Sequence, residues 1–189
     1  MCIRDRKRGS LELTKTVNSL EVLENQAVFS LSNIPDRPGI AAHIFETLSE
    51  ASINVDLIIQ ATNDGNKNDI TFTVGALEVK KTAEQCELIT SQLGGEFNLK
   101  TNMTKLSIQG AGIMGRPSVS ADLFDTLSQA NINVRLIATS EIKVSCVIEI
   151  NNIPKAIRFV AEKFKLSDTQ IFVNPVSYTH LTLPTKRIV

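Results

Sequence analysis

The sequence has no tryptophan, one tyrosine and only three cysteines among its 189 residues. Cys2, Cys86 and Cys146 are odd in number, widely spaced and without a C-x-x-C pair. This argues against a disulfide framework or a zinc site and favours reduced thiols. No apolar run approaches the roughly 18 residues of a membrane span, and the basic start lacks the apolar stretch of a signal peptide. We therefore expect a cytoplasmic protein without a membrane or metal partner.

Charge is unevenly distributed, although the formal net charge is zero. Without the basic ends, residues 11–176 contain 14 basic and 19 acidic side chains. Because a basic face supplies most of the affinity for nucleic acids, this acidic body predicts no nucleic-acid partner.

The two ends differ from the rest of the chain. They resemble the translated adapter sequence that flanks genes assembled from environmental DNA, and the C-terminal end holds the only tyrosine, Tyr178. We expect residues 1–13 and 177–189 to be non-native or disordered segments, and the chain to be a fragment.

An internal repeat organises the remainder. Residues 37–58, RPGIAAHIFETLSEASINVDLI, align without a gap to residues 116–137, RPSVSADLFDTLSQANINVRLI, at an offset of 79. The two segments are identical at 13 of 22 positions, which indicates a duplication.

Each copy predicts the order β-α-β-β-α-β. In the first copy, β-rich runs at 26–34, 55–62, 69–76 and 96–101 alternate with helical periodicity at about 40–51 and 80–93. In the second copy, strands are expected at 104–110, 134–140, 143–150 and 170–174, and helices at 118–130 and 153–165. This order predicts an α+β protein of two ferredoxin-like units, each an antiparallel sheet with both helices on one face. The sequence does not fix which sheet accepts a surplus strand at 16–23.

The connection SIQGAGIMGRPS contains G-x-G-x-x-G at Gly110, Gly112 and Gly115, the outline of a dinucleotide-binding turn. Such a turn needs a parallel β-α-β unit and an acidic residue about 20 positions later, where this chain has Arg135. The first copy has LSNIPDRPG at the same place, without the motif glycines. We therefore interpret the glycine pattern as coincidental. Each strand–turn–helix connection has two interpretations. It is either a plain linker or a place where the free N–H groups of the helix start bind a carboxylate.

Two long stretches carry a family resemblance: PDRPGIAAHIFETLSEASINVDLIIQ with NDITFTV, and KLSIQGAGIMGRPSVSADLFDTLSQANINVRLIATSEIKVSCVI. Over residues 14–175 the chain resembles the regulatory region of aspartate kinase, a tandem pair of amino-acid-binding ACT domains. The resemblance implies a first ACT domain at 14–101, including the surplus strand, and a second at 102–176. The catalytic motifs of the kinase domain are absent, so we expect no enzyme activity from this chain alone.

The resemblance implies feedback control of aspartate phosphorylation, the first step towards lysine, threonine and methionine. Lysine, threonine or both would bind between ACT domains as effectors, without a cofactor. The implied partners are a second copy, through the ACT domains, and the kinase catalytic domain or subunit.

Carried over by position, the implied effector-binding residues come from a loop–helix start and a partner side. The loop side has Asp36, Gly39, Ala41 and Ala42, with Gln60 at the end of the second strand. The partner side has Ser120, Asn133, Val134, Ser140 and Glu141. Asp36 and Glu141 are the carboxylates that would favour lysine over threonine.

Each of these residues also has a structural interpretation. Asp36 could brace its turn, Ser140 and Glu141 could form a tight hairpin turn, and Asn133 could cap the preceding helix. Ser118 stands where the family usually has glycine, which either closes the second loop to a ligand or caps the helix. Two other functions stay open: a dimerisation-only ACT module, and the ACT regulatory part of another amino-acid biosynthetic enzyme.

Overall fold

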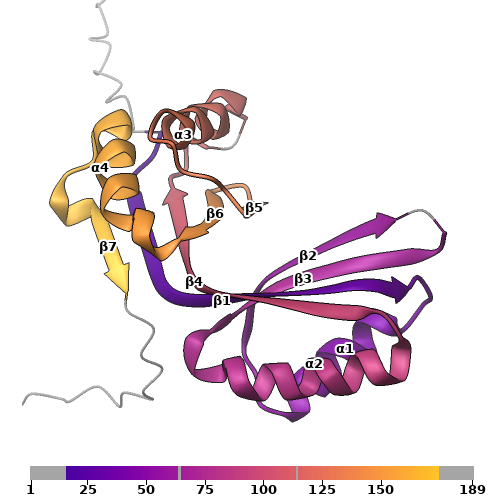
Figure 1. Ribbon diagram of the computed structural model, residues 1–189. Coiled ribbons are helices and arrows are strands. Elements are labelled where there is room, and N and C mark those ends of the chain that lie inside the picture. Colours follow the sequence, from indigo (N-terminus) through magenta and orange to yellow (C-terminus); the bar gives the residue numbers. More distant parts are fainter. Residues whose placement is uncertain (1–15, 64, 114, 175–189) are drawn as a thin grey trace, which may run out of the picture. The chain divides into compact units, whose positions relative to one another are not determined.

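The computed structural model describes residues 16–63, 65–113 and 115–174 (Figure 1). These residues form two compact units, which follow the two repeats. The first-repeat unit contains residues 22–105 together with 173 and 174, and the second-repeat unit contains residues 16–21 and 106–172. The terminal segments expected to be non-native, 1–13 and 177–189, lie outside the described residues.

The first-repeat unit has the predicted β-α-β-β-α-β order. Its elements are β1 (Ser19–Pro35), α1 (Ile40–Glu50), β2 (Val55–Asn63), β3 (Lys67–Gly75), α2 (Val79–Leu93) and β4 (Glu96–Gln109), with a 3₁₀ turn at Ala76–Glu78 before α2. The strands lie in the order β2-β3-β1-β4, and β3 is antiparallel to both neighbours. This is the strand order of a ferredoxin-like unit.

Both helices of this unit cover one face of its sheet (Figure 1). Buried side chains of β1 and β3 meet the apolar stripes of the helices, and the rings of Phe29 and Phe72 stack with centroids 5.7 Å apart. Ile44 and Leu48 of α1 are fully or almost fully buried against this layer. The helical periodicity of residues 40–51 thus corresponds to a core-facing side of α1.

The second-repeat unit adds five elements after β4. They are α3 (Pro117–Gln129), β5 (Leu136–Thr139), β6 (Lys143–Glu149), α4 (Ile153–Phe164) and β7 (Ile171–Asn174), with 3₁₀ turns at Ile150–Asn152 and Asp168–Gln170. In this unit β4 neighbours β6, β6 neighbours β5, and β7 pairs with β1. Pro117 and Pro154 lie in the first turns of their helices, where a missing N–H leaves no helical bond unmade. The predicted fold class is confirmed in both repeats.

Two strands are longer than the sequence predicts. The runs 16–23 and 26–34 join into β1, and the runs 96–101 and 104–110 join into β4. Between the runs, Asn25 and Asn102 have positive φ angles of 54° and 58°, and each strand continues past this local irregularity. Asparagine tolerates this left-handed conformation better than most residues.

The surplus N-terminal strand also groups differently from the expected division at residue 101. Residues 16–21 belong to the second-repeat unit, where the Asn18 N–H donates a 2.7 Å hydrogen bond to the Gln109 carbonyl. Local sequence pattern carries no information about this pairing, because the partners are far apart along the chain.

Candidate functional site

The glycine-rich connection between β4 and α3 does not form a dinucleotide-binding turn. The strand that follows α3, β5, is separated from β4 by β6, so the two strands do not form an adjacent parallel pair. The match to the nucleotide motif is therefore coincidental, as expected, but the glycines have a structural role of their own. A Cβ at Gly110 would lie 2.2 Å from the Thr16 carbonyl oxygen, and a Cβ at Gly112 would lie 2.7 Å from the Thr16 Cα. Gly115 has a φ of 74°, which suits glycine.

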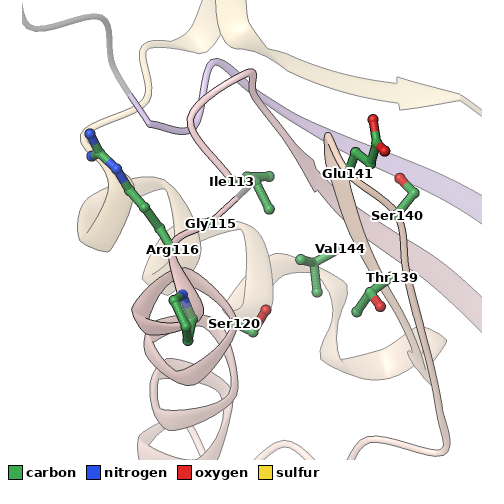
Figure 2. A pocket seen from close by; sticks show the side chains of 9 residues that line it. Ile113, Gly115, Arg116, Ser120, Thr139, Ser140, Glu141 and Val144 are labelled. Carbon is green, nitrogen blue, oxygen red and sulfur yellow. The ribbon is translucent and has the colours of Figure 1, made fainter.

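The same connection forms one wall of a pocket of about 360 Å³ in the second-repeat unit. We call it the hairpin pocket, because the turn between β5 and β6 forms its opposite wall (Figure 2). Its lining residues are Ile113, Gly115, Arg116, Pro117, Ser120, Thr139, Ser140, Glu141 and Val144. The pocket thus brings together three of the residues singled out from the sequence: Ser120, Ser140 and Glu141.

The hairpin pocket combines an apolar base with polar groups at its edges. Ile113 and Val144 are 8% and 1% exposed. Ser120 lies in the first turn of α3, where backbone N–H groups lack helical acceptors and the helix dipole favours an anion. Glu141 supplies a carboxylate on the opposite side (Figure 2). The pocket therefore offers separate environments for the carboxylate and the ammonium group of an amino acid.

Two cationic side chains close to this pocket are already paired. Arg116 Nη1 donates a 2.7 Å hydrogen bond to Thr16 Oγ1, and its guanidinium points away from the hairpin (Figure 2). Lys143 Nζ lies 2.7 Å from a carboxylate oxygen of Glu21. Ser140 and Glu141 lie in a tight turn, in which the Ser140 N–H donates to the Lys143 carbonyl at 2.8 Å. Ser140 and Glu141 therefore form a tight turn, and the same turn lines the pocket.

Asn133 and Val134 lie in a second pocket of the same unit, about 450 Å³ in volume. Its other lining residues are Phe124, Ser128, Asn131 and Ile132. The five partner-side residues therefore do not form one site within this unit. Asn133 is not the left-handed residue after α3, because Asn131 has that role with a φ of 52°.

In the first-repeat unit, Asp36 lies in the loop between β1 and α1, where its backbone and side chain are both held. Its N–H donates to the Asn66 carbonyl at 2.8 Å, and its carboxylate accepts a 2.8 Å hydrogen bond from Asn68 Nδ2. Asn68 is only 4% exposed, and its Oδ1 has no hydrogen-bond partner. Burying an amide is costly, so this hydrogen bond partly offsets the cost of placing Asn68 under the loop.

The remaining loop-side residues lie at the start of α1 and on β2. Gly39 precedes α1 with a φ of 90°, and a Cβ there would meet no atom within 4 Å, so the backbone is open to approach. Ala41 and Ala42 occupy the first turn of α1. Gln60 lies opposite Ile70 in the β2–β3 ladder, which places its side chain on the helix-covered face shared with Asn68.

The two repeats place their acidic residues differently. At the offset of 79, Asp36 corresponds to Gly115, and Glu141 corresponds to Thr62. The first repeat therefore has its carboxylate on the loop before the helix, and the second has its carboxylate after the second strand.

Sequence reasoning did not identify several residues of these sites. Ile113, Arg116, Thr139 and Val144 line the hairpin pocket, and Asn68 holds Asp36. Thr139 could have been found from the repeat, because it lies at the position of Gln60. Asn68 could not have been found from the repeat, because the strands of the β5–β6 hairpin are shorter than those of the β2–β3 hairpin and the two repeats no longer align there.

Among the described residues, the cysteines and the possible metal ligands do not form a further site. Cys86 and Cys146 are fully buried, and burial raises the pKa of each thiol from 9.0 to about 12. In the described part of the chain, no three His, Cys, Asp or Glu residues are grouped so that they could hold a metal ion. None of the helices seen there is long and apolar enough to cross a membrane.

Comparisons with known proteins identify the family. The family model of the ACT domain matches residues 32–87 and 106–164. Aspartokinase from Thermus thermophilus is 34% identical over 162 residues, which are 85% of this chain and 40% of that protein. Aspartokinase from Helicobacter pylori is 34% identical over 159 residues, which are 84% and 39%. The chain thus spans about 40% of the length of these curated relatives.

Solved structures give the same result. The regulatory subunit of aspartate kinase from Thermus flavus is 34% identical, with a TM-score of 0.73 over 78% of this chain and 98% of that chain. Aspartate kinase from Synechocystis is 35% identical, with a TM-score of 0.79 over 83% of this chain and 28% of that chain. The chain therefore belongs to the ACT domain family, as a tandem pair of ACT domains similar to the regulatory region of aspartate kinase.

Proposed function

We propose that this chain is an amino-acid sensor that binds lysine, threonine or both, and that binding inhibits aspartate phosphorylation by an associated kinase domain or subunit. Such feedback would control the pathway to lysine, threonine and methionine. An effector can inhibit only by favouring one arrangement of the regulated protein over another, to the extent of its difference in affinity for the two.

The observation that carries this proposal is the hairpin pocket. Its volume of about 360 Å³ suits a small molecule, and its two sides differ in electrostatic character. The first turn of α3 favours the effector carboxylate, and Glu141 favours an ammonium group. A buried apolar base formed by Ile113 and Val144 would contact the methylene groups of a lysine side chain or the methyl group of threonine.

The loop between β1 and α1 is the second proposed site. Asp36, fixed by Asn68, supplies a carboxylate beside the open backbone of Gly39. Gln60, Ala41 and Ala42 would line the same site. Completion of either site by another ACT domain is part of the proposal, as the family resemblance implies.

Relatives support the effector class. Aspartokinase III from E. coli has been solved in complex with lysine and aspartate, and it shares this fold at 17% identity with a TM-score of 0.65. Another similar structure, 32% identical over 79% of this chain, contains aspartokinase alpha and beta subunits. We propose by analogy that this chain works with a kinase catalytic domain or subunit.

A second copy of the chain is the other proposed partner. The strands β2 and β5 each have only one neighbour in the sheet order. Their equivalent residues Ile58 and Ile137 are 52% and 46% exposed. An apolar edge strand with unpaired backbone groups favours pairing with another chain. This observation favours a homodimer, and by itself it would also suit an ACT module that only dimerises.

Thermal unfolding of the full chain tests effector binding and separates it from dimerisation alone. A ligand at about 100 times its dissociation constant adds roughly 2.7 kcal/mol to the free energy of unfolding. We expect Tm to rise by about 5–10 °C with lysine or threonine, and not with methionine. Asp36→Ala should reduce the rise if the first-repeat site is occupied, and Glu141→Gln should reduce it if the hairpin pocket is occupied. An unchanged Tm with every amino acid, in a protein that still dimerises, would favour the dimerisation-only module.

A further inference from the structure

The glycine-rich connection before α3 contacts the N-terminal segment, which we define as residues 16–21. Thr16 and Val17 pass so close to Gly110 and Gly112 that any side chain there would collide with their backbone. Within this contact, Asn18 is hydrogen-bonded to Gln109, and Arg116 donates to the Thr16 hydroxyl. Val17 is 2% exposed, so the segment is a packed part of the second-repeat unit.

The N-terminal segment is linked to both walls of the hairpin pocket. On the first wall, Arg116 lines the pocket and binds Thr16. On the second wall, the turn that contains Glu141 ends at Lys143, which forms an ion pair with Glu21. The two walls also contact each other, because the Gly110 N–H donates to the Ile142 carbonyl at 2.9 Å. The position of the segment therefore helps to set the spacing of the walls between which a ligand would lie.

The first repeat makes its close backbone contact at this connection with different residues. Leu31 and Asn33 stand where the second repeat has Gly110 and Gly112. There the glycine lies on the neighbouring segment instead, because a Cβ at Gly95, just before β4, would lie 2.4 Å from the Ser32 carbonyl oxygen. Glycines on the connection itself, facing the N-terminal segment, are thus specific to the second repeat.

From these contacts we infer that Thr16 is a positioning residue of the hairpin pocket, and that amino-acid binding in this pocket is coupled to the seating of the N-terminal segment. The inference rests on the proposed function of the pocket. Thr16 does not line the pocket; it acts through Arg116 and the glycine-rich connection. Because coupling of this kind is reciprocal, a ligand that contacts both walls also stabilises the position of the segment. A change that loosens the segment in turn weakens ligand binding.

The test compares three variants of the full chain. Thr16→Val removes the hydroxyl at nearly constant volume, and Thr16→Ser retains the hydroxyl. Thr101→Val makes the same change at an exposed threonine on β4, outside both proposed sites, and it serves as the matched control. Affinity for lysine and threonine is measured by calorimetry, and amide hydrogen exchange is measured in peptides covering residues 16–23 with and without the amino acid.

We expect the bound amino acid to slow exchange in this segment, and Thr16→Val to weaken binding by about fivefold, at the lower end of typical couplings. Thr16→Ser and Thr101→Val should bind normally, and all variants should unfold within a few degrees of the wild type. If the wild type binds an amino acid but exchange is unchanged and Thr16→Val binds equally well, the coupling is wrong and the proposed function stands. If the wild type binds neither lysine nor threonine, both the coupling and the proposed function are wrong.

Discussion

The side-chain amide of Asn68, at the start of β3, donates a 2.8 Å hydrogen bond to the carboxylate of Asp36 in the loop before α1. Asp36 is exposed, whereas Asn68 is buried beneath the loop. The carboxylate that would meet an effector is thus oriented by a residue that a ligand in the loop would not need to touch.

Replacing Asn68 should therefore weaken the first-repeat site without unfolding the protein. Asn68→Ala removes a hydrogen bond to a charged group, and we expect it to lower amino-acid affinity at this site by about tenfold. Calorimetric titration with lysine and threonine measures the loss. Asn98→Ala changes an exposed asparagine on β4 of the same unit and is the control. Equal affinity for lysine and threonine in both variants would show that Asn68 does not contribute to the site.

The carboxylate of Glu141 should discriminate between effectors. Because lysine carries a second ammonium group and threonine does not, Glu141→Gln should reduce lysine affinity by about tenfold and change threonine affinity less. Competition between the two amino acids at a fixed concentration of protein measures the ratio directly. Glu50→Gln, at the end of α1, should leave the ratio unchanged. A parallel loss of both affinities would mean that Glu141 binds the α-ammonium group, which the two ligands share.

Equivalent core leucines should have similar effects on stability in the two repeats. Leu48 and Leu127 occupy the same repeat position and are 1% and 0% exposed. Each change to alanine should lower the free energy of unfolding by about 2–5 kcal/mol, from lost burial and the cavity that remains. Denaturant titration measures the loss. Leu77→Ala, at a residue 77% exposed, should change it by less than about 0.5 kcal/mol. A small effect at only one of the two leucines would show that the repeats pack differently.

The buried thiols should make the protein less stable at high pH. Burial raises the pKa of Cys86 and Cys146 from 9.0 to about 12, so the folded state keeps protons that the unfolded chain loses. Below pH 9 both states are protonated and this contribution is constant. Between pH 9 and 12 the free energy of unfolding should fall by up to about 1.4 kcal/mol per pH unit for each thiol.

Urea unfolding at several pH values, in a Cys2→Ser background, measures this slope. The double variant Cys86→Ala and Cys146→Ala should flatten it, because the ionisable groups are gone, although the protein will be less stable overall. The same two thiols should resist a thiol reagent at pH 8 until urea unfolds the chain. Rapid reaction in the folded state would contradict their burial.

The helices of the fold could be predicted closely, for physical reasons. The expected helix at 80–93 is observed at Val79–Leu93, and Gly94, with a φ of 79°, ends it. The apolar periodicity and the positions of Pro and Gly are local signals, and they survive in the folded chain because they agree with its packing. The strand order of the first-repeat unit is the one that the ferredoxin-like fold has, and that fold was predicted from the β-α-β-β-α-β order.

The contacts that matter most for the sites could not be predicted locally. The pairing of Thr16 with Arg116 joins residues 100 positions apart, and that of Asn68 with Asp36 joins residues 32 apart. A single sequence records neither pairing. The glycines at 110 and 112 were visible as a motif, but their cause is the backbone of Thr16 and Val17, which only the fold brings to that position.

The most direct test of the account is calorimetric titration of the full chain with lysine and threonine, with methionine as control, in the wild type and in Ser120→Leu. Leucine at Ser120 would fill the hairpin pocket, whereas Ala121→Leu changes the exposed neighbour on α3 and controls for the added side chain. We predict saturable binding of lysine or threonine to the wild type and to Ala121→Leu. Binding at the hairpin pocket should be lost in Ser120→Leu. Binding of neither amino acid to the wild type would contradict the account.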